Sequence, residues 1–239
     1  MRVEDDTVIP EGSRAGAAMQ TGRQAGSEPV PARIELEMVN PERLVFFSDA
    51  VIAIAITLLA LELPAPVGQT NAELWRDLAR NVNDYVAFLI SFAVIGGHWF
   101  LHHRTFGHVA RLSGRLVRWN MLWLLMIVLT PFVTRVIVGD GAFAARFTLY
   151  AAIQALASLF FLLAVLEMDR HGLARAGTPR SLFGNGYRIL SVAAGAFAVS
   201  IPLAFVTHWA YACWAAIPFV ARVRRLADAA RRRPRRAMV

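Results

Sequence analysis

The chain has 239 residues, of which 56% are hydrophobic and only 18% are charged, and its formal net charge is +8. A soluble globular domain has about a quarter charged residues, whereas a membrane-spanning helix needs about 20 predominantly apolar residues in a row. The apolar residues here fall in blocks of that kind, which excludes a soluble domain and predicts an all-α, polytopic membrane protein. All 25 basic residues are Arg, which favours a GC-rich bacterial genome and hence a bacterial inner membrane.

The segment before the first apolar block is rich in Gly, Pro, Ser and charged residues and has no hydrophobic periodicity, which is typical of disorder. A helix is predicted to begin at Asn40-Pro41-Glu42, because Asn caps a helix well, Pro fits its first position and an acid suits its first turn. The predicted divisions are a disordered cytoplasmic tail (1–38), a six-helix transmembrane domain (39–225) and an Arg-rich cytoplasmic tail (226–239).

Six apolar blocks predict six transmembrane helices in a single copy, without an internal repeat. Their approximate extents are Leu44–Leu63, Val82–Leu101, Leu116–Val138, Phe147–Leu166, Ile189–Val206 and Trp209–Val223. Arg is concentrated in the loops after the second and fourth blocks and in the segment after the sixth. Because cytoplasmic loops are enriched in basic residues, both termini are expected in the cytoplasm.

The Arg-rich C-terminal tail has two interpretations. It suits a nucleic-acid or regulatory-lipid binding arm, or a topology signal that also attracts anionic lipid headgroups by roughly 1 kcal/mol per Arg. We favour the second interpretation, with membrane lipids as partners and no nucleic acid.

The first apolar block contains an acid, Asp49, beside Ser48 and one to two turns from Arg43. A charged side chain costs about 2.5–3.5 kcal/mol at the centre of a membrane helix, so Asp49 is expected to be partnered or functional. At 100° per residue, Ile54, Leu58 and Leu61 fall within about 40° of one line, and Ser48 and Asp49 lie roughly 120° to 140° away. The helix therefore has an apolar stripe on one side, flanked by the hydroxyl of Thr57, and polar anchors on the other. Taken alone, such a stripe also suits a lipid-facing or bundle-core surface.

The pattern Arg43-x-x-x-Phe47-Ser48-Asp49, followed by AxxAIAITLLxLEL, resembles the signature of the bacterial branch of the transmembrane protein 175 family. The segments SFAVIGGHWFLHHRTF and NMLWLLMIVLTPF are similar to that family too, so the likeness covers about residues 40–225. Members of this family are potassium-permeable channels without a carbonyl-lined filter. The resemblance implies a homotetramer in which the first helix of each subunit lines a central pore.

The resemblance also implies roles for particular residues. Ile54, Leu58 and Leu61 would form the constriction and gate, and Thr57 would give a modest preference for K⁺ over Na⁺. Permeant K⁺ is then the only ligand expected, with no cofactor and no bound metal. For the motif residues we favour a structural lock over contact with ions. Its expected members are Arg43, Phe47, Ser48, Asp49, Trp99, His102, His103 and Asn120.

Three alternatives remain at the level of sequence. His98 and His102 are four residues apart on one helical face, which suits an intramembrane haem or metal protein, or an enzyme that also uses Asp49. A small-solute transporter is the third class, although such proteins usually contain an internal repeat. No catalytic carboxylate pair, nucleophile elbow or phosphate-binding loop is visible, so an enzyme is not the favoured interpretation.

Glu62 is predicted at the outer mouth, where four copies would concentrate cations, or else at the interface with its side chain directed to water.

Overall fold

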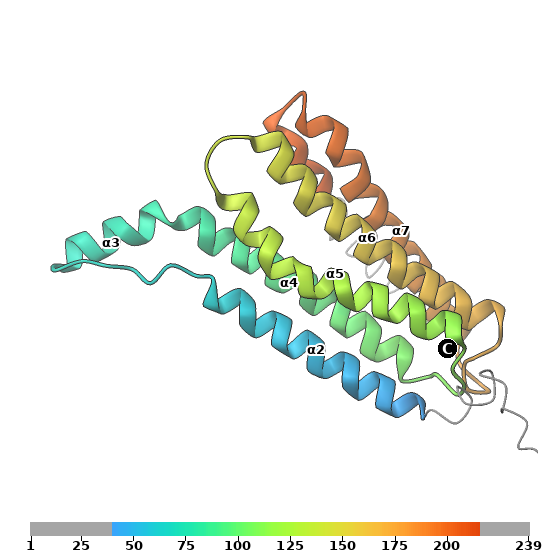
Figure 1. Ribbon diagram of the computed structural model, residues 1–239. Helices are drawn as coiled ribbons and strands as arrows, with labels where there is room; N and C mark the ends of the chain where they lie inside the picture. Colours follow the sequence, from blue (N-terminus) through green and yellow to red (C-terminus); the bar gives the residue numbers. More distant parts are fainter. Residues whose placement is uncertain (1–39, 216–239) are drawn as a thin grey trace, which may run out of the picture. The chain divides into compact units, whose positions relative to one another are not determined.

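The computed structural model describes residues 40–215, and every regular element in that range is a helix. Five helices are long and apolar enough to cross a membrane. They are α2 (Pro41–Leu61), α4 (Val82–Phe106), α5 (Gly114–Val138), α6 (Phe143–Arg170) and α7 (Arg180–Ala204). A short helix, α3 (Asn71–Arg80), follows α2, and a 3-10 helix, η1 (His208–Ala215), ends the described part (Figure 1). The prediction of an all-α protein with several membrane spans is confirmed.

The predicted sixth span, Trp209–Val223, only partly overlaps the described residues. Its first part corresponds to η1, and its remainder lies outside the described range. The two predicted tails, residues 1–38 and 226–239, lie outside that range too.

Helix α2 begins where the sequence predicts. The side chain of Asn40 accepts a hydrogen bond from the main-chain N–H of Glu42 at 2.9 Å, and Pro41 occupies the first turn. The helix ends at Leu61, two residues before Leu63, and Pro64 follows. A Pro disfavours the helical conformation in the residue before it, which explains why the helix does not reach the predicted end.

The spans pack in a definite order. Helix α6 lies between α5 and α7, and α2 packs against α4 and α5 (Figure 1). The centre of the bundle is filled by large apolar side chains without measurable exposure. These are Ile95, Leu116, Trp123, Ile127 and Phe161.

Two loops meet at the end of the bundle where α2 begins (Figure 1). The main-chain N–H of Ala110, in the α4–α5 loop, donates to the carbonyl of Leu173, in the α6–α7 loop, at 2.8 Å. The N–H of Arg175 donates to the carbonyl of His108 at 2.8 Å. These are two of the Arg-rich segments, so the predicted grouping of the basic loops on one side agrees with the structure.

Candidate functional site

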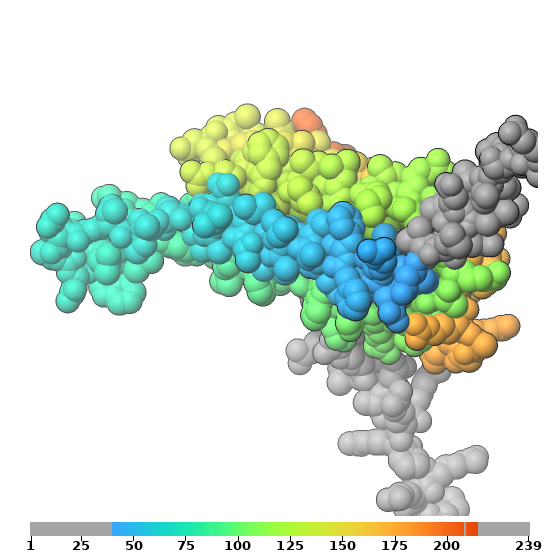
Figure 2. Space-filling model, turned by 60° about the horizontal axis from the view of Figure 1, so that its bottom comes forward, coloured from blue at the N-terminus to red at the C-terminus, as the bar shows by residue number. Residues whose placement is uncertain are grey.

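Helix α2 has one face that contacts no other helix among residues 40–215. Its buried residues are Leu44, Ser48, Ile52, Ala55 and Leu59, which lie three or four positions apart and face α4 and α5. The exposed face consists mainly of Phe46, Phe47, Ala50, Ala53, Ile54, Thr57, Leu58 and Leu61. In Figure 2, α2 runs along the surface of the molecule, in blue.

The exposed face is apolar over most of its length. Ile54 is 59% exposed, Leu58 40% and Leu61 79%. Burying one such side chain away from water is worth about 1.5–3 kcal/mol, so exposing this whole face to water would be unfavourable. The face therefore requires lipid, another subunit or a narrow apolar passage against it.

Thr57 supplies the hydroxyl on this face. Its Oγ1 donates a hydrogen bond to the main-chain carbonyl of Ile54 at 2.8 Å. A hydroxyl has one proton and two lone pairs, and here the proton is directed into the helix. The lone pairs of Thr57 Oγ1 remain for an acceptor role, which is the property that a cation ligand needs.

On the opposite side, a chain of hydrogen bonds joins three helices. Asn120 of α5 donates from Nδ2 to Ser48 Oγ of α2 at 3.0 Å, and the Ser48 hydroxyl donates to the carbonyl of Leu44 at 2.8 Å. His102 Nε2 of α4 lies 3.1 Å from Asn120 Oδ1. Because an amide oxygen only accepts, His102 must carry its proton on Nε2. Ser48, His102 and Asn120 are at most 1% exposed.

Asp49 is partnered beside this chain. Trp99 Nε1 donates to Asp49 Oδ1 at 3.1 Å, and His103 Nδ1 lies 3.9 Å from Asp49 Oδ2. The acid that is costly in a membrane thus has a hydrogen-bond donor and an imidazole beside it, both from α4. We call the set Ser48, Asp49, Trp99, His102, His103 and Asn120 the polar lock.

Two motif residues stand apart from the polar lock. Arg43 and Phe47 lie on the exposed side of α2, and Phe47 is 51% exposed. Within residues 40–215, no hydrogen bond or ion pair involves the Arg43 side chain. On α2, these two positions share a face with Ile54 and Leu58 rather than with Ser48, which faces Asn120 of α5.

The two histidines of the haem or metal alternative already have other partners. His102 stacks between Phe106 and Trp123, with ring centroids 4.1 Å and 4.6 Å away. Trp123 Nε1 donates to His98 Nδ1 at 3.1 Å, so this nitrogen acts as an acceptor. Across the described range, no group of three or more His, Cys, Asp and Glu residues is arranged to hold a metal ion. The arrangement is that of a packed aromatic and hydrogen-bonded core.

Sequence reasoning missed a second buried network, between α4, α5 and α6. Ser91 Oγ lies 2.7 Å from Thr134 Oγ1 and 3.1 Å from the Tyr150 hydroxyl. Gln154 Nε2 donates to Thr130 Oγ1 at 3.2 Å. The available signal was the presence of these polar residues within apolar blocks, which in a membrane requires internal partners.

Sequence reasoning also missed the partner of Glu62. Arg135 of α5 lies with its Nε 3.9 Å from Glu62 Oε2, and its Nη1 donates to the Glu62 carbonyl at 3.2 Å. The carboxylate predicted for the outer mouth is therefore paired with a base on a neighbouring helix.

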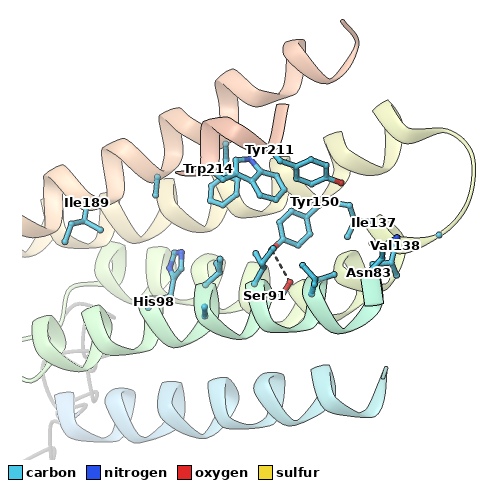
Figure 3. Close-up of a pocket in the computed structure, with 18 of the residues that line it drawn as sticks. Asn83, Ser91, His98, Ile137, Val138, Tyr150, Ile189, Tyr211 and Trp214 are labelled. Carbon is cyan, nitrogen blue, oxygen red and sulfur yellow. Dashed lines mark hydrogen bonds between the residues drawn. The ribbon is translucent and has the colours of Figure 1, made fainter. Parts of the chain in front are cut away.

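A hollow of about 960 Å³ lies on the side of α4 that faces away from α2 (Figure 3). Its walls include Ser91 and His98 of α4, Tyr150 of α6 and Ile189 of α7. Trp214 of η1 also lines it, close to where the described part of the chain stops. The hollow is separate from the exposed face of α2.

Comparison with known proteins gives consistent matches. The model of the family described as the endosomal/lysosomal potassium channel TMEM175 matches residues 43–131, which include the polar lock and the exposed face of α2. A protein from Streptomyces collinus named as a potassium channel is 32% identical over 181 residues, which cover 70% of this chain and 86% of the relative. A potassium channel from Chamaesiphon minutus is 32% identical over 189 residues, covering 72% and 88%.

Among solved structures, the chain is similar to a crystal structure described as a lysosomal potassium-selective channel TMEM175 homolog from Chamaesiphon minutus. The TM-score is 0.63 at 28% identity, and the match covers 76% of this chain and 96% of that chain.

The polar lock predicts a large stability effect at Asn120. In Asn120→Ala, the buried Ser48 hydroxyl and His102 Nε2 each lose a partner, and each such loss costs about 1–3 kcal/mol. We expect a clear fall in the apparent melting temperature of the detergent-solubilised protein, followed by tryptophan fluorescence. Met121→Ala, on the adjacent and 37% exposed position, is the matched control and should change it much less. Equal melting temperatures for the two variants would contradict the assigned hydrogen bonds.

Proposed function

The chain belongs to the TMEM175 family, and we propose that it is a potassium-permeable cation channel whose pore is lined by the exposed face of α2. It is thus a membrane channel rather than an enzyme. The observation that carries the proposal is the exposed stripe of Ile54, Leu58 and Leu61, with the Thr57 hydroxyl beside it, on a helix held from behind by the polar lock.

A homotetramer around a central axis would bring four such faces together. The relatives from Streptomyces collinus and Chamaesiphon minutus are both named as potassium channels, which supports a shared ion pathway. The basic loops at the end where α2 begins support a cytoplasmic location for that end, in a bacterial inner membrane with both termini inside.

In this proposal the gate is the apolar neck, which consists of the Ile54 and Leu58 side chains of all four subunits. Rings of Ile54 and Leu58 form a constriction that excludes water when narrow and so blocks ions by dewetting, and Leu61 extends the apolar wall outward. Opening needs only enough widening for water to enter. The neck therefore controls flux without a charged gate.

The Thr57 ring accounts for ion preference. Potassium gives up its hydration water more readily than sodium does, and the outward-facing lone pairs of Thr57 Oγ1 replace part of that shell. A single layer of hydroxyl oxygens offers far fewer ligands than a carbonyl-lined filter. The expected preference for K⁺ over Na⁺ is consequently modest.

The proposed domain keeps its sixth span, Trp209–Val223. Tyr211 and Trp214 line the hollow beside α4, and the residues that follow them in the sequence are largely apolar. The apolar run of Trp209–Val223 supports a sixth span.

The proposal predicts a gain of flux for a polar substitution in the neck. Ile54→Asn lets water into the constriction, so we expect K⁺ flux into proteoliposomes to rise roughly tenfold, which corresponds to a barrier lower by about 1.4 kcal/mol. Val199, 58% exposed on α7, offers a matched control: Val199→Asn should leave the flux unchanged. An Ile54 variant that conducts like the parent protein would rule out a gate at this position.

The role of Thr57 is tested by a pair of variants. Thr57→Val keeps the shape of the side chain and removes the oxygen, so we expect the K⁺-over-Na⁺ permeability ratio to fall towards one. Thr57→Ser keeps the oxygen and should retain the preference. The ratio follows from reversal potentials with K⁺ on one side of a planar bilayer and Na⁺ on the other. Preserved preference in the Val variant would show that selectivity lies elsewhere.

A further inference from the structure

Arg135 lies in the last turn of α5 and contacts the ends of two other helices. Its Nη1 donates to the main-chain carbonyl of Glu62, just after α2, and lies 3.8 Å from Asp84 Oδ1, in the first turn of α4. Its Nε faces the Glu62 carboxylate at 3.9 Å. The guanidinium group thus contacts three oxygen atoms: the carbonyl oxygen and one carboxylate oxygen of Glu62, and one carboxylate oxygen of Asp84.

The ion pair with Arg135 brings the Glu62 carboxylate close to α5. Leu61 is 79% exposed on the proposed pore face, and Glu62 is the next residue. Helix α5 packs behind α2, on its buried side, so the ion pair draws the carboxylate towards α5 and away from Leu61. A free Glu62 would be able to turn towards the pore axis.

The other acids nearby are held by their own segment. Glu73 accepts from the main-chain N–H groups of Gln69 and Thr70, and Asp77 Oδ2 accepts from that of Val67. Among residues 40–215, Arg135 is the one base within ion-pair distance of Glu62 or Asp84.

We propose that Arg135 is a positioning residue that sets the electrostatic field at the outer mouth of the pore, by holding Glu62 against α5 and offsetting its charge. The inference rests on the proposed pore along α2. Glu62, Asp84 and Arg135 together carry one net negative charge per subunit, so the mouth attracts cations weakly. Without Arg135 that charge doubles, and the carboxylate is free to approach the ion path.

Ionic strength separates this effect from a change in structure. Fixed charges act over a Debye length of about 30 Å at 0.01 M salt but only about 3 Å at 1 M. A fixed charge at the outer mouth therefore alters the K⁺ conductance at low salt and has almost no effect on it at high salt. A damaged pore would conduct differently at both.

The test is single-channel recording of Arg135→Gln in planar bilayers in 10 mM and 1 M KCl. We expect the inward K⁺ conductance to rise roughly threefold at 10 mM and to change by less than about 1.2-fold at 1 M. Arg135→Lys keeps the charge and should stay near the parent value. Glu62→Gln should lower the low-salt conductance, and Glu62→Gln combined with Arg135→Gln should return it towards the parent value.

Arg76→Gln is the matched control, because it removes one positive charge from the same side of the chain. The Arg76 Nε donates to the carbonyl of Ala72 in its own helix, away from Glu62. An equal gain in Arg76→Gln, a gain that persists at 1 M, or no change in either Arg135→Gln or Glu62→Gln would overturn the inference. If Arg135→Gln fails to fold, the conductance of Glu62→Gln at 10 mM KCl still tests the inference, because we expect it to fall rather than to rise. A parent protein without K⁺ current in any condition would instead overturn the proposed channel function.

Discussion

The hydrogen-bonded chain from Ser48 through Asn120 to His102 is the interaction on which the arrangement of α2 depends. Hydrocarbon offers no partner to a buried hydroxyl, amide or imidazole, so these groups must meet one another inside the bundle. That requirement fixes the rotation of α2 about its own axis relative to α4 and α5. Once Ser48 faces inward, the stripe through Ile54 and Leu58 has to face outward.

The two ends of α2 are held by different chemistry. Near its start, α2 is held by buried hydrogen bonds among Ser48, Asn120 and His102, with the more exposed Asp49 carboxylate paired to Trp99 and His103. At its end, Arg135 uses exposed ion pairs, which contribute little to stability but act on ions at a distance. Between these two points the contacts of α2 are apolar, with the small side chain of Ala55 fully packed. A helix fixed in this way suits a gate formed by side chains.

The polar residues within the spans are thus mainly structural. Ser91, Thr134 and Tyr150 join α4, α5 and α6, while the stacked rings of His102 and Trp123 fill the centre of the bundle behind α2. In the proposed channel, the residues that would meet ions are three aliphatic side chains and one hydroxyl. The charged and polar residues of α2 then serve the scaffold, and the proposed ion path runs along the face of α2 that the scaffold leaves uncovered.

The sequence by itself determined the features that depend on local geometry. The start of α2 at Asn40, the shared face of Ile54 and Leu58, and the need of Asp49 for partners all follow from capping, helical periodicity and the cost of a charge in hydrocarbon. The polar residues of the other predicted spans also led us to expect Trp99, His102, His103 and Asn120 as those partners.

Only the tertiary structure decided which distant side chains meet. Arg135 and Glu62 are 73 residues apart, and Ser91 and Tyr150 are 59 apart, so their contacts depend on the depth and rotation of packed helices. The same packing left Arg43 on the exposed side of α2, although it belongs to the motif. Periodicity tells which residues of one helix share a face. It carries no information on which face of another helix lies opposite, and that pairing is set by the packing of whole side-chain surfaces.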